Sequence, residues 1–294
     1  MTGRPGDPAP VKAAVLGSPI AHSLSPVLHR AGYVAAGLDG WSYTAIECGE
    51  AGLPALVAAC GADGAGWAGL SLTMPLKRAI LPLLDHVDPV AADVGGANTV
   101  VFAGGRRRGY NTDVAGMVDA LAAAGVRAPR SAVILGAGTT ACSALAALRQ
   151  TGLRAATVAV RDESRAAGLL SVAERLGVRV RLWPLESAAA VTAGQDLLIS
   201  AVPAGAADYY AEHCRPEDIP GVVFDVVYAP WPTALARAAK SARATVIGGF
   251  ELLLRQAGGQ FELMTGYRPA PLAAMRGTGQ AELDRRAAQA ASPS

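Results

Sequence analysis

Short apolar runs alternate with helix-like stretches along the first half of this chain. The apolar runs predict strands at Lys12–Gly17, Trp41–Ile46 and Trp67–Leu72, and a hairpin of Asn98–Phe102 with Arg107–Tyr110 across two glycines. The stretches between them predict helices at Pro26–Gly37, Leu53–Cys60 and Pro75–Leu84. Strands and helices that alternate in this way predict a mostly parallel sheet covered by helices.

A second series of the same kind follows a helical stretch over Val114–Gly125. Its predicted strands are Ala132–Leu135, Ala156–Val160, Arg179–Leu182, Asp196–Ile199, Val222–Val226 and Ala244–Ile247, and its clearest helices are Ala141–Gln150, Glu163–Leu176 and Thr233–Ala239. After Gly248-Gly249 the pattern is helical only, over Phe250–Thr265 and Pro271–Met275, and the polar tail beyond Gly277 is expected to be a frayed helix or disordered. The chain is therefore α/β, with two α/β domains.

Composition and charge exclude several classes of protein. The chain has 294 residues, of which 51% are hydrophobic and 17% charged, enough for two domains with substantial cores. A net charge of +2 without a basic stripe predicts no nucleic-acid partner, and no apolar run reaches the length of about 18 residues that a membrane span needs. Residues 1–10 are expected to be a disordered leader without a secretion signal. The four cysteines are widely spaced, which predicts reduced thiols in a cytoplasmic protein and no metal site: Cys48, Cys60, Cys142 and Cys214.

A glycine turn between a strand and a helix is the most informative motif. The apolar strand ending at Leu135 runs into Gly136-Ala137-Gly138-Thr139-Thr140-Ala141, and a helix-forming run follows. The first glycine permits a tight turn, the second lets a pyrophosphate approach the main chain, and Ala141 lets the helix pack close to the strand. Free N–H groups at the helix start favour an anion. This context predicts a dinucleotide site, whereas the glycines alone also fit an ordinary structural turn.

The residues after the next strand bear on which dinucleotide binds. Where NAD-binding proteins of this fold carry an acidic residue, this chain has Val160 followed by Arg161, with Arg165 four residues on. Two guanidinium groups favour a 2′-phosphate, and therefore NADP. Asp162 leaves NAD possible, because a carboxylate there can accept from a ribose hydroxyl or pair with Arg165.

Polar segments follow the strands of the first domain, at the edge where parallel sheets place their sites. In the first segment, Ser23 and Ser25 lie two apart in what is expected to be extended chain, so that both hydroxyls face one side before Pro26 starts a helix. Lys77 falls in the first turn of a helix, where the dipole disfavours a cation, so its presence needs another reason. The further segments are Leu70–Lys77, Gly96–Thr99 and Tyr110–Asp113.

Taken together, these segments resemble the shikimate dehydrogenase family over nearly the whole chain. The family pattern is a G-x-P-I-x-H-S-x-S-P opening, then N-V-T-x-P-x-K, G-A-x-N-T, N-T-D-x-x-G, a glycine-rich turn, D-x-x-Y-x-P-x-x-T and a late G-x-x-M-L-x-x-Q. The matching segments here are His22–Pro26, Thr73–Lys77, Asn98-Thr99, Asn111–Gly116, Asp225–Thr233 and Gly249–Gln256.

The resemblance implies a role for each matching residue. Lys77 is implied as the catalytic acid/base, with Asp113 as its hydrogen-bonded partner. The implied substrate ligands are Ser23, Ser25 and Tyr228 for the carboxylate, and Thr73, Asn98, Asp113 and Gln256 for the ring hydroxyls. The implied cofactor ligands are Gly136, Ala137, Gly138, Thr139, Thr140 and Ala141 for the pyrophosphate, Arg161 and Arg165 for the 2′-phosphate, Val202, Val226 and Gly249 along the nicotinamide half, and Asp85 near the cofactor.

The implied architecture is discontinuous. Residues 11–113 and 249–294 would form the substrate domain and residues 114–248 a Rossmann-type NADP domain, with ligands in the cleft between them. The two glycines at 248 and 249 fit such a crossing and fit a simple helix start equally well. The chain would be a monomer or a homodimer.

The implied reaction is the reversible, NADPH-dependent reduction of 3-dehydroshikimate to shikimate, a step of chorismate and aromatic amino acid biosynthesis. Ser71 stands where the family has Asn, which removes an amide expected to contact a ring hydroxyl, and Val160 and Asp162 depart from the family around Arg161. These departures keep quinate or an aminoshikimate as alternative substrates and NAD as an alternative cofactor. A catalytically inactive NADP sensor is a third alternative, although Lys77 and Asp113 are both present.

Overall fold

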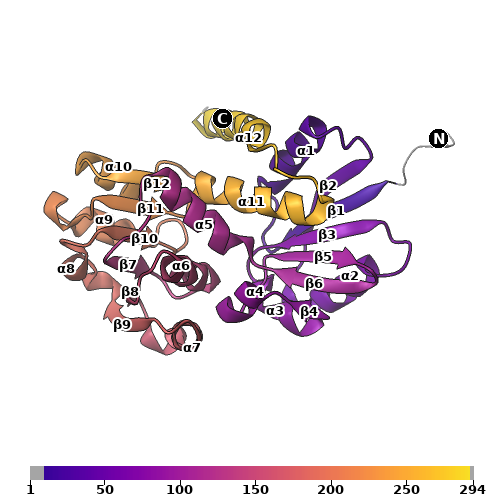
Figure 1. Cartoon of the computed structure of the whole chain (residues 1–294). Coiled ribbons are helices and arrows are strands. Elements are labelled where there is room, and N and C mark those ends of the chain that lie inside the picture. Colours follow the sequence, from indigo (N-terminus) through magenta and orange to yellow (C-terminus); the bar gives the residue numbers. More distant parts are fainter. Residues whose placement is uncertain (1–9, 292–294) are drawn as a thin grey trace. The chain divides into compact units, whose positions relative to one another are not determined.

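The structure is a computed structural model that describes residues 10–291, so the leader predicted over 1–10 falls almost entirely outside the described residues (Figure 1). The described residues form two compact units, one of residues 10–92, 96–112 and 257–291 and the other of 93–95 and 113–256. Asp113 and residues 249–256 therefore group with the second unit, unlike in the division drawn from the sequence. The reason is that helices α5 (Thr112–Ala123) and α11 (Gly249–Thr265) run unbroken across both boundaries.

The first unit is built on a six-stranded mixed sheet in the order β2-β1-β3-β5-β6-β4. The strands are β1 (Val11–Gly17), β2 (Trp41–Glu47), β3 (Trp67–Leu72), β4 (His86–Val87), β5 (Thr99–Ala103) and β6 (Arg106–Tyr110). The predicted mostly parallel sheet is confirmed, and β5 is the strand that runs against its two neighbours. The predicted hairpin turns at Gly104 and Gly105, whose positive φ angles of 59° and 69° suit a two-residue turn.

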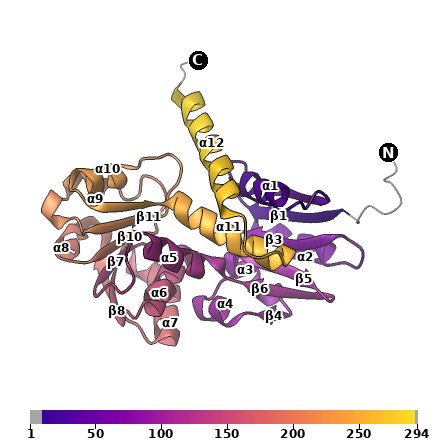
Figure 2. The ribbon, with the colours of Figure 1, turned by 45° about the horizontal axis from the view of Figure 1, so that its top comes forward.

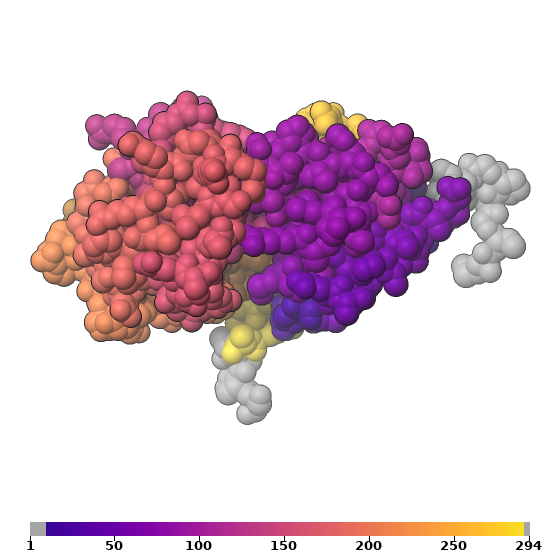
Figure 3. Space-filling view, turned by 90° about the horizontal axis from the view of Figure 1, so that it is seen from below, coloured from indigo at the N-terminus to yellow at the C-terminus, as the bar shows by residue number. Residues whose placement is uncertain are grey.

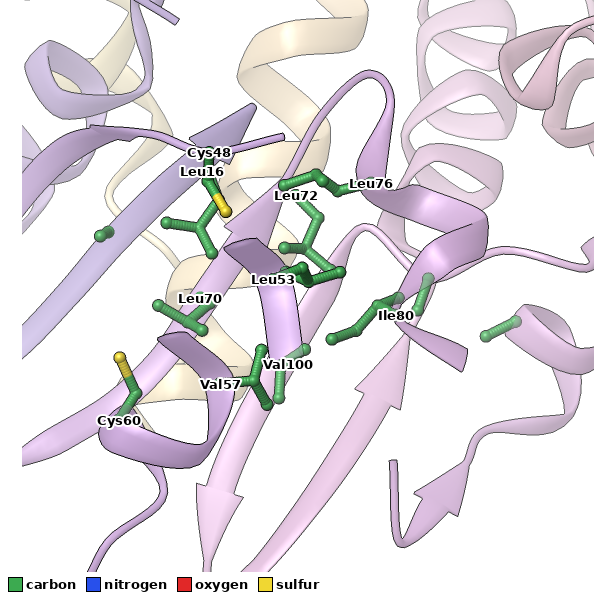
Figure 4. Packing of buried hydrophobic residues seen from close by; sticks show 13 residues of the cluster. Leu16, Cys48, Leu53, Val57, Cys60, Leu70, Leu72, Leu76, Ile80 and Val100 are labelled. Carbon is green, nitrogen blue, oxygen red and sulfur yellow. The ribbon is translucent and has the colours of Figure 1, made fainter. Parts of the chain in front are cut away.

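Alternating side chains of β1 bury both faces of this sheet. Ala14 and Leu16 pack with α2 (Leu53–Cys60) and α3 (Leu76–Ala79) in the core shown in Figure 4. Ala13 and Val15 point to the opposite face, where α1 (Ser25–Ala35) and α11 contribute Tyr33, Phe261 and Met264. The remaining helical segments of this part of the chain are η1 (Glu50–Gly52), η2 (Leu81–Leu83), α4 (Pro89–Val94) and α12 (Leu272–Ala291).

Two helix predictions in the first unit were wrong. The helix expected over Pro75–Leu84 is a single turn, α3, followed by the 3-10 turn η2. Pro82 explains the break, because proline has no N–H to donate and its ring collides with the preceding turn. The tail beyond Gly277 is neither frayed nor disordered through Ala290, because α12 continues without a break and lies against α1 (Figure 2).

The second unit carries a fully parallel sheet in the order β12-β11-β10-β7-β8-β9. Its strands are β7 (Ala132–Leu135), β8 (Ala155–Val160), β9 (Arg179–Pro184), β10 (Leu197–Ser200), β11 (Val222–Asp225) and β12 (Thr245–Gly248). The chain reverses its direction of travel across the sheet between β7 and β10, which is the switch point where doubly wound sheets bind ligands. This is the predicted Rossmann arrangement.

Helices cover both faces of the second sheet. The helix α6 (Thr139–Gln150) lies beside α7 (Ala167–Leu176), whereas α8 (Ala189–Thr192), α9 (Asp208–His213) and α10 (Ala234–Ser241) cover the other face. Three 3-10 turns complete the unit, η3 (Glu163–Ala166), η4 (Leu185–Ser187) and η5 (Pro216–Asp218). The sequence missed α4, α8 and α9 because none exceeds six residues, too few for a periodic pattern. Figure 3 shows one face of the surface, with the residue numbers of both units in colour.

Candidate active site

The polar segments of the first unit gather at one edge of its sheet. β1 and β3 end there at Gly17 and Leu72, and the antiparallel strand β5 begins there after Asn98. The main chain ties these ends together, because Leu72 N–H donates to the Asn98 carbonyl at 2.8 Å and Thr73 N–H donates to Leu16 at 2.9 Å. Main-chain hydrogen bonds therefore connect the ends of β1 and β3 with the start of β5 at the edge predicted to hold the chemistry.

Ser23 and Ser25 lie on a turn, so the expected extended chain between them was wrong. The turn over residues 20–23 is closed by a hydrogen bond of 2.9 Å from Ser23 N–H to the Ile20 carbonyl, and Leu24 has helical angles, φ −90° and ψ −10°. Ser25 is the first residue of α1 and its N–H donates to Ser23 Oγ at 3.3 Å. The two hydroxyl-bearing residues are still neighbours, with Ser25 buried and Ser23 half-buried. They remain suited to bind one carboxylate.

The C-terminal helix holds this turn from outside. Arg286 Nη1 donates to the carbonyl of His22, the residue before Ser23, at 2.8 Å. Glu282 accepts from Arg286 Nε at 2.7 Å and from Arg285, and these hydrogen bonds lower the pKa of Glu282 to about 2. Nothing in the local sequence pattern predicted this link, because its partners are 264 residues apart.

Lys77 and Asn98 are joined through one residue. The carbonyl of Lys77 accepts from the N–H of Ala97 at 2.8 Å. The next residue, Asn98, is 1% exposed, and its Oδ1 accepts from Thr112 N–H at 2.9 Å while its Nδ2 donates to Thr112 Oγ1 at 3.0 Å. Asp113 follows Thr112 directly, so its backbone lies one residue from these hydrogen bonds. Lys77 itself is half-buried.

Thr73 is placed by the glycine that ends β1. A Cβ added to Gly17 would overlap the Thr73 methyl group and would lie 3.0 Å from the Met74 carbonyl. Glycine is therefore required at position 17 because two segments approach closely there. The sequence pattern showed Gly17 only as a residue of the motif. Ser71, two residues earlier, is 2% exposed, and its hydroxyl bonds Tyr43 at 2.6 Å and Gln260 at 2.8 Å.

In the second unit the glycine turn has the geometry of a phosphate cradle. Gly136 has φ +100°, and a Cβ there would lie 2.9 Å from Val202 Cγ1. Gly138 precedes α6 with φ −75° and ψ −177°, and apart from its two chain neighbours no heavy atom of the described chain lies within 4 Å of where its Cβ would be. Ala141 is fully buried, as expected for a helix packed close to the strand. The space beside Gly138, at the start of α6, is therefore open, which fits a dinucleotide pyrophosphate.

Arg161 and Arg165 flank a capped turn after β8. Both are exposed, and Asp162 between them caps η3, accepting from Ser164 N–H at 2.9 Å and from the Ser164 hydroxyl at 2.6 Å. Those bonds lower the pKa of Asp162. One of the two carboxylate oxygens of Asp162, Oδ1, is thus bound to Ser164. Within the described chain Arg161 forms no ion pair.

Three residues implied for the nicotinamide half follow neighbouring strands. Val202 comes after β10, Val226 after β11, and Gly249 after β12, and Val226 N–H donates to Ser200 at 3.1 Å. A Cβ on Gly249 would overlap the Val226 carbonyl. Tyr228 sits in the same region, in a loop closed by a bond of 2.6 Å from Thr233 Oγ1 to the buried Asp225 carboxylate. Burial raises the pKa of Asp225.

The last two implied residues differ in outcome. Gln256 is buried in α11, its backbone next to Gly116 of α5, where a Cβ would lie 3.0 Å from the Gln256 nitrogen. Asp85 makes a two-pronged ion pair with Arg107 at 2.8 and 2.9 Å, which holds its pKa far below the usual range. Asp85 thus has a structural partner that joins the start of β4 to β6.

Among the described residues there is no group of three or more His, Cys, Asp or Glu that could hold a metal ion. No helix in the described part of the chain is both long enough and apolar enough to cross a membrane.

Comparison with known proteins gives a consistent result. Residues 15–100 match the shikimate dehydrogenase substrate binding domain, and residues 120–215 match shikimate / quinate 5-dehydrogenase. A shikimate dehydrogenase (NADP(+)) of Thermus thermophilus is 38% identical over 89% of this chain and 95% of its own length.

Two solved structures agree with it. Mycobacterium tuberculosis shikimate dehydrogenase has a TM-score of 0.82 and 43% identity, covering 93% of this chain and 100% of that one. The Thermus thermophilus enzyme in complex with NADP(H) and shikimate has a TM-score of 0.80 and 34% identity, covering 92% and 99%. With two family models and relatives that match over almost their full length, this chain belongs to the shikimate dehydrogenase family.

Proposed function

We propose that this chain is an NADP-dependent shikimate dehydrogenase that interconverts shikimate and 3-dehydroshikimate. The observation that carries the proposal is the continuous link from Lys77 through Ala97 and Asn98 to Thr112, next to Asp113. Curated relatives with this activity support it. The alternatives of quinate, aminoshikimate or an inactive sensor are not favoured by the comparisons.

Lys77 is the proposed proton carrier. When the alcohol is oxidised, the carbon loses a hydride and its hydroxyl loses a proton, and the amine Nζ of Lys77 accepts that proton. In the reverse direction the Lys77 ammonium donates it to the ketone oxygen. Asp113 is proposed to orient this ammonium and to accept a hydrogen bond from a ring hydroxyl. General acid–base help of this kind contributes about 10²–10⁴-fold.

The remaining residues are proposed to hold the substrate still. Ser23 and Ser25 donate hydroxyl protons to its carboxylate, which suits their adjacent positions on the turn before α1. Tyr228 assists them, while Thr73, Asn98 and Gln256 bond the ring hydroxyls. Neutral donors at a carboxylate set its orientation without an ion pair.

The second unit fits NADP. The open space at Gly138 and the N-terminus of α6 suit the pyrophosphate, with Arg161 and Arg165 at the 2′-phosphate and Val202, Val226 and Gly249 along the nicotinamide half. Bound NADP would supply the hydride acceptor for the alcohol and, when reduced, the hydride donor. The free thiols of the described cysteines support a reducing, cytoplasmic setting, and the product suits aromatic biosynthesis.

The test is a matrix of initial rates, followed through the absorbance of the reduced nicotinamide. Shikimate with NADP should give the highest kcat/KM among shikimate and quinate with NADP and NAD. Lys77→Met should lower kcat by about 10²–10⁴-fold with both KM values within a few-fold. Arg78→Met, which removes the adjacent cation of the same short helix, is the control and should keep near wild-type kcat. A higher kcat/KM for quinate, or full activity of Lys77→Met, would overturn the proposal.

A further inference from the structure

A chain of buried hydrogen bonds with a fixed direction lies behind Asn98 in the first unit. Tyr43 Oη bonds Ser71 Oγ at 2.6 Å, Ser71 Oγ bonds Gln260 Oε1 at 2.8 Å, and Gln260 Nε2 donates to the Asn98 carbonyl at 3.0 Å. None of these four residues is more than 2% exposed.

The direction follows from the carbonyl end. A carbonyl oxygen only accepts, so the amide NH₂ of Gln260 must face Asn98 and its oxygen must face Ser71. The Ser71 hydroxyl therefore donates its one proton to Gln260, and Tyr43 must donate its own proton to Ser71. Both hydrogen bonds of the Ser71 hydroxyl thus go to Gln260 of α11 and Tyr43 of β2. Ser71 therefore has a structural role at the position where the family has asparagine.

The Asn98 carbonyl is held from two sides. It accepts from Leu72 N–H in the sheet at 2.8 Å and from Gln260 at 3.0 Å, which uses both of its lone pairs. This carbonyl fixes the peptide plane between Asn98 and Thr99. The Asn98 side chain is bonded separately, to Thr99 and Thr112. The direction of its amide therefore depends on both sets of bonds.

Helix α1 is connected to the same chain of bonds. His29 is fully buried four residues after Ser25, and its ring stacks on Tyr43 with centroids 4.0 Å apart and planes within 9°. Burial lowers the pKa of His29 to about 3, so it is neutral near pH 7. The neutral His29 ring stacked on Tyr43 limits the movement of the Tyr43 phenol, which is the first donor in this series of hydrogen bonds.

We propose that Gln260 is a positioning residue that sets the orientation of Asn98 toward the substrate, and that Ser71 and Tyr43 fix the amide of Gln260. This inference rests on the proposed function, because it takes Asn98 as a ligand of a ring hydroxyl. Gln260 touches no substrate in this scheme, and it acts through the main chain of Asn98.

The first test is Gln260→Leu, which keeps the size of the side chain and removes both hydrogen bonds. The KM for shikimate should rise about 5- to 10-fold, the effect of one lost hydrogen bond, whereas the KM for NADP should stay within about twofold. Gln280→Leu, the same change at an exposed position of α12, is the matched control and should change neither KM. A shikimate KM for Gln260→Leu within about twofold of wild type would overturn the proposal.

The second test is Gln260→Glu, which gives a readout that a purely structural role does not move. A protonated carboxyl group donates and accepts as the amide does, but a carboxylate has no proton for the Asn98 carbonyl, and burial raises the pKa of such a carboxyl. His29 and Tyr43 are ionisable groups close to position 260, and in the wild-type protein both are neutral near pH 7. The ratio of the variant's shikimate KM to that of wild type should rise about 5- to 10-fold with pH as the carboxyl ionises. A ratio that stays flat would overturn the proposal.

Failure of Gln260→Leu to fold and failure of the proposed function can each be told apart from failure of the positioning role. If Gln260→Leu fails to fold, Tyr43→Phe removes one hydroxyl and should raise the shikimate KM about 2- to 5-fold, and an unchanged KM would again overturn the positioning role. If wild type itself does not turn over shikimate, the proposed function fails. An active wild type with unaffected variants contradicts only the role of Gln260.

Discussion

The sharpest prediction concerns Gly138, where stability and cofactor binding should respond in opposite ways to Gly138→Ala. The backbone angles there, φ −75° and ψ −177°, are open to any residue, and beyond its two chain neighbours the added methyl group meets no heavy atom of the described chain within 4 Å. Alanine also restricts the unfolded chain, which stabilises the folded state by about 0.4–1 kcal/mol. For a domain of this size the melting temperature should rise by about 1–4 °C.

The same methyl group should exclude NADP. It would occupy the open space beside Gly138 where the pyrophosphate is expected, and loss of one charge-assisted hydrogen bond costs about 1.5–3 kcal/mol. The Kd for NADP should therefore rise about 10- to 150-fold, measured by calorimetry, while the shikimate KM at saturating NADP stays near wild type.

Two matched variants separate the causes. Gly221→Ala also adds a methyl group in open space, but on an exposed loop, and should leave the Kd unchanged. Gly136→Ala should lower stability instead, because its φ of +100° and the 2.9 Å approach to Val202 oppose a side chain. An unchanged NADP Kd in Gly138→Ala would refute the assignment of this turn to the phosphates.

Three more predictions follow from the geometry. Gly17→Ala should push Thr73 aside, which costs about 1–3 kcal/mol of stability and raises the shikimate KM but not the NADP KM. A shikimate KM equal to that of wild type would contradict the role of Thr73. Thr233→Val should cost about 2–4 kcal/mol in urea unfolding, since the α10 cap and a donor to Asp225 are both lost, and a cost under about 1 kcal/mol would refute this. With the pKa of His29 lowered to about 3, only the unfolded chain binds its proton between about pH 6.5 and 3, so stability falls as the pH falls. His29→Phe should remove up to about 1.4 kcal/mol per pH unit of that slope, and parallel stability curves of both proteins between about pH 7 and 5 would contradict it.

Local chemistry made most of the fold predictable. The apolar run of β1 and the glycine turn after β7 are short-range signals, and the structure has both where they were expected. The failures have local causes as well. Pro82 ended a helix that periodicity extended to Leu84. Neither Gly277 nor Gly279 ended α12, because each glycine in a helix costs only about 1 kcal/mol.

The candidate site was predictable as a set of residues but not as a set of bonds. Motif spacing singled out Ser23, Lys77 and Asn98, and the resemblance to a family gave them roles. The partners that hold them were invisible, because Gln260 reaches Asn98 across 162 residues and Arg286 reaches His22 across 264. A hydrogen bond between distant segments leaves no periodic trace in either of them.

The order of synthesis gives the discontinuous first unit a particular vulnerability. Its sheet is complete once residue 110 has been made, but Phe261 and Met264, which cover Ala13, Val15 and Tyr43, come some 150 residues later. Until then one face of the nascent sheet exposes apolar side chains, a state prone to aggregate or to bind chaperones. The second unit, almost entirely one continuous segment, can fold on the ribosome while the first is still waiting for its cover. A chain truncated before residue 257 should therefore contain a folded second unit joined to a first unit whose sheet still exposes apolar side chains.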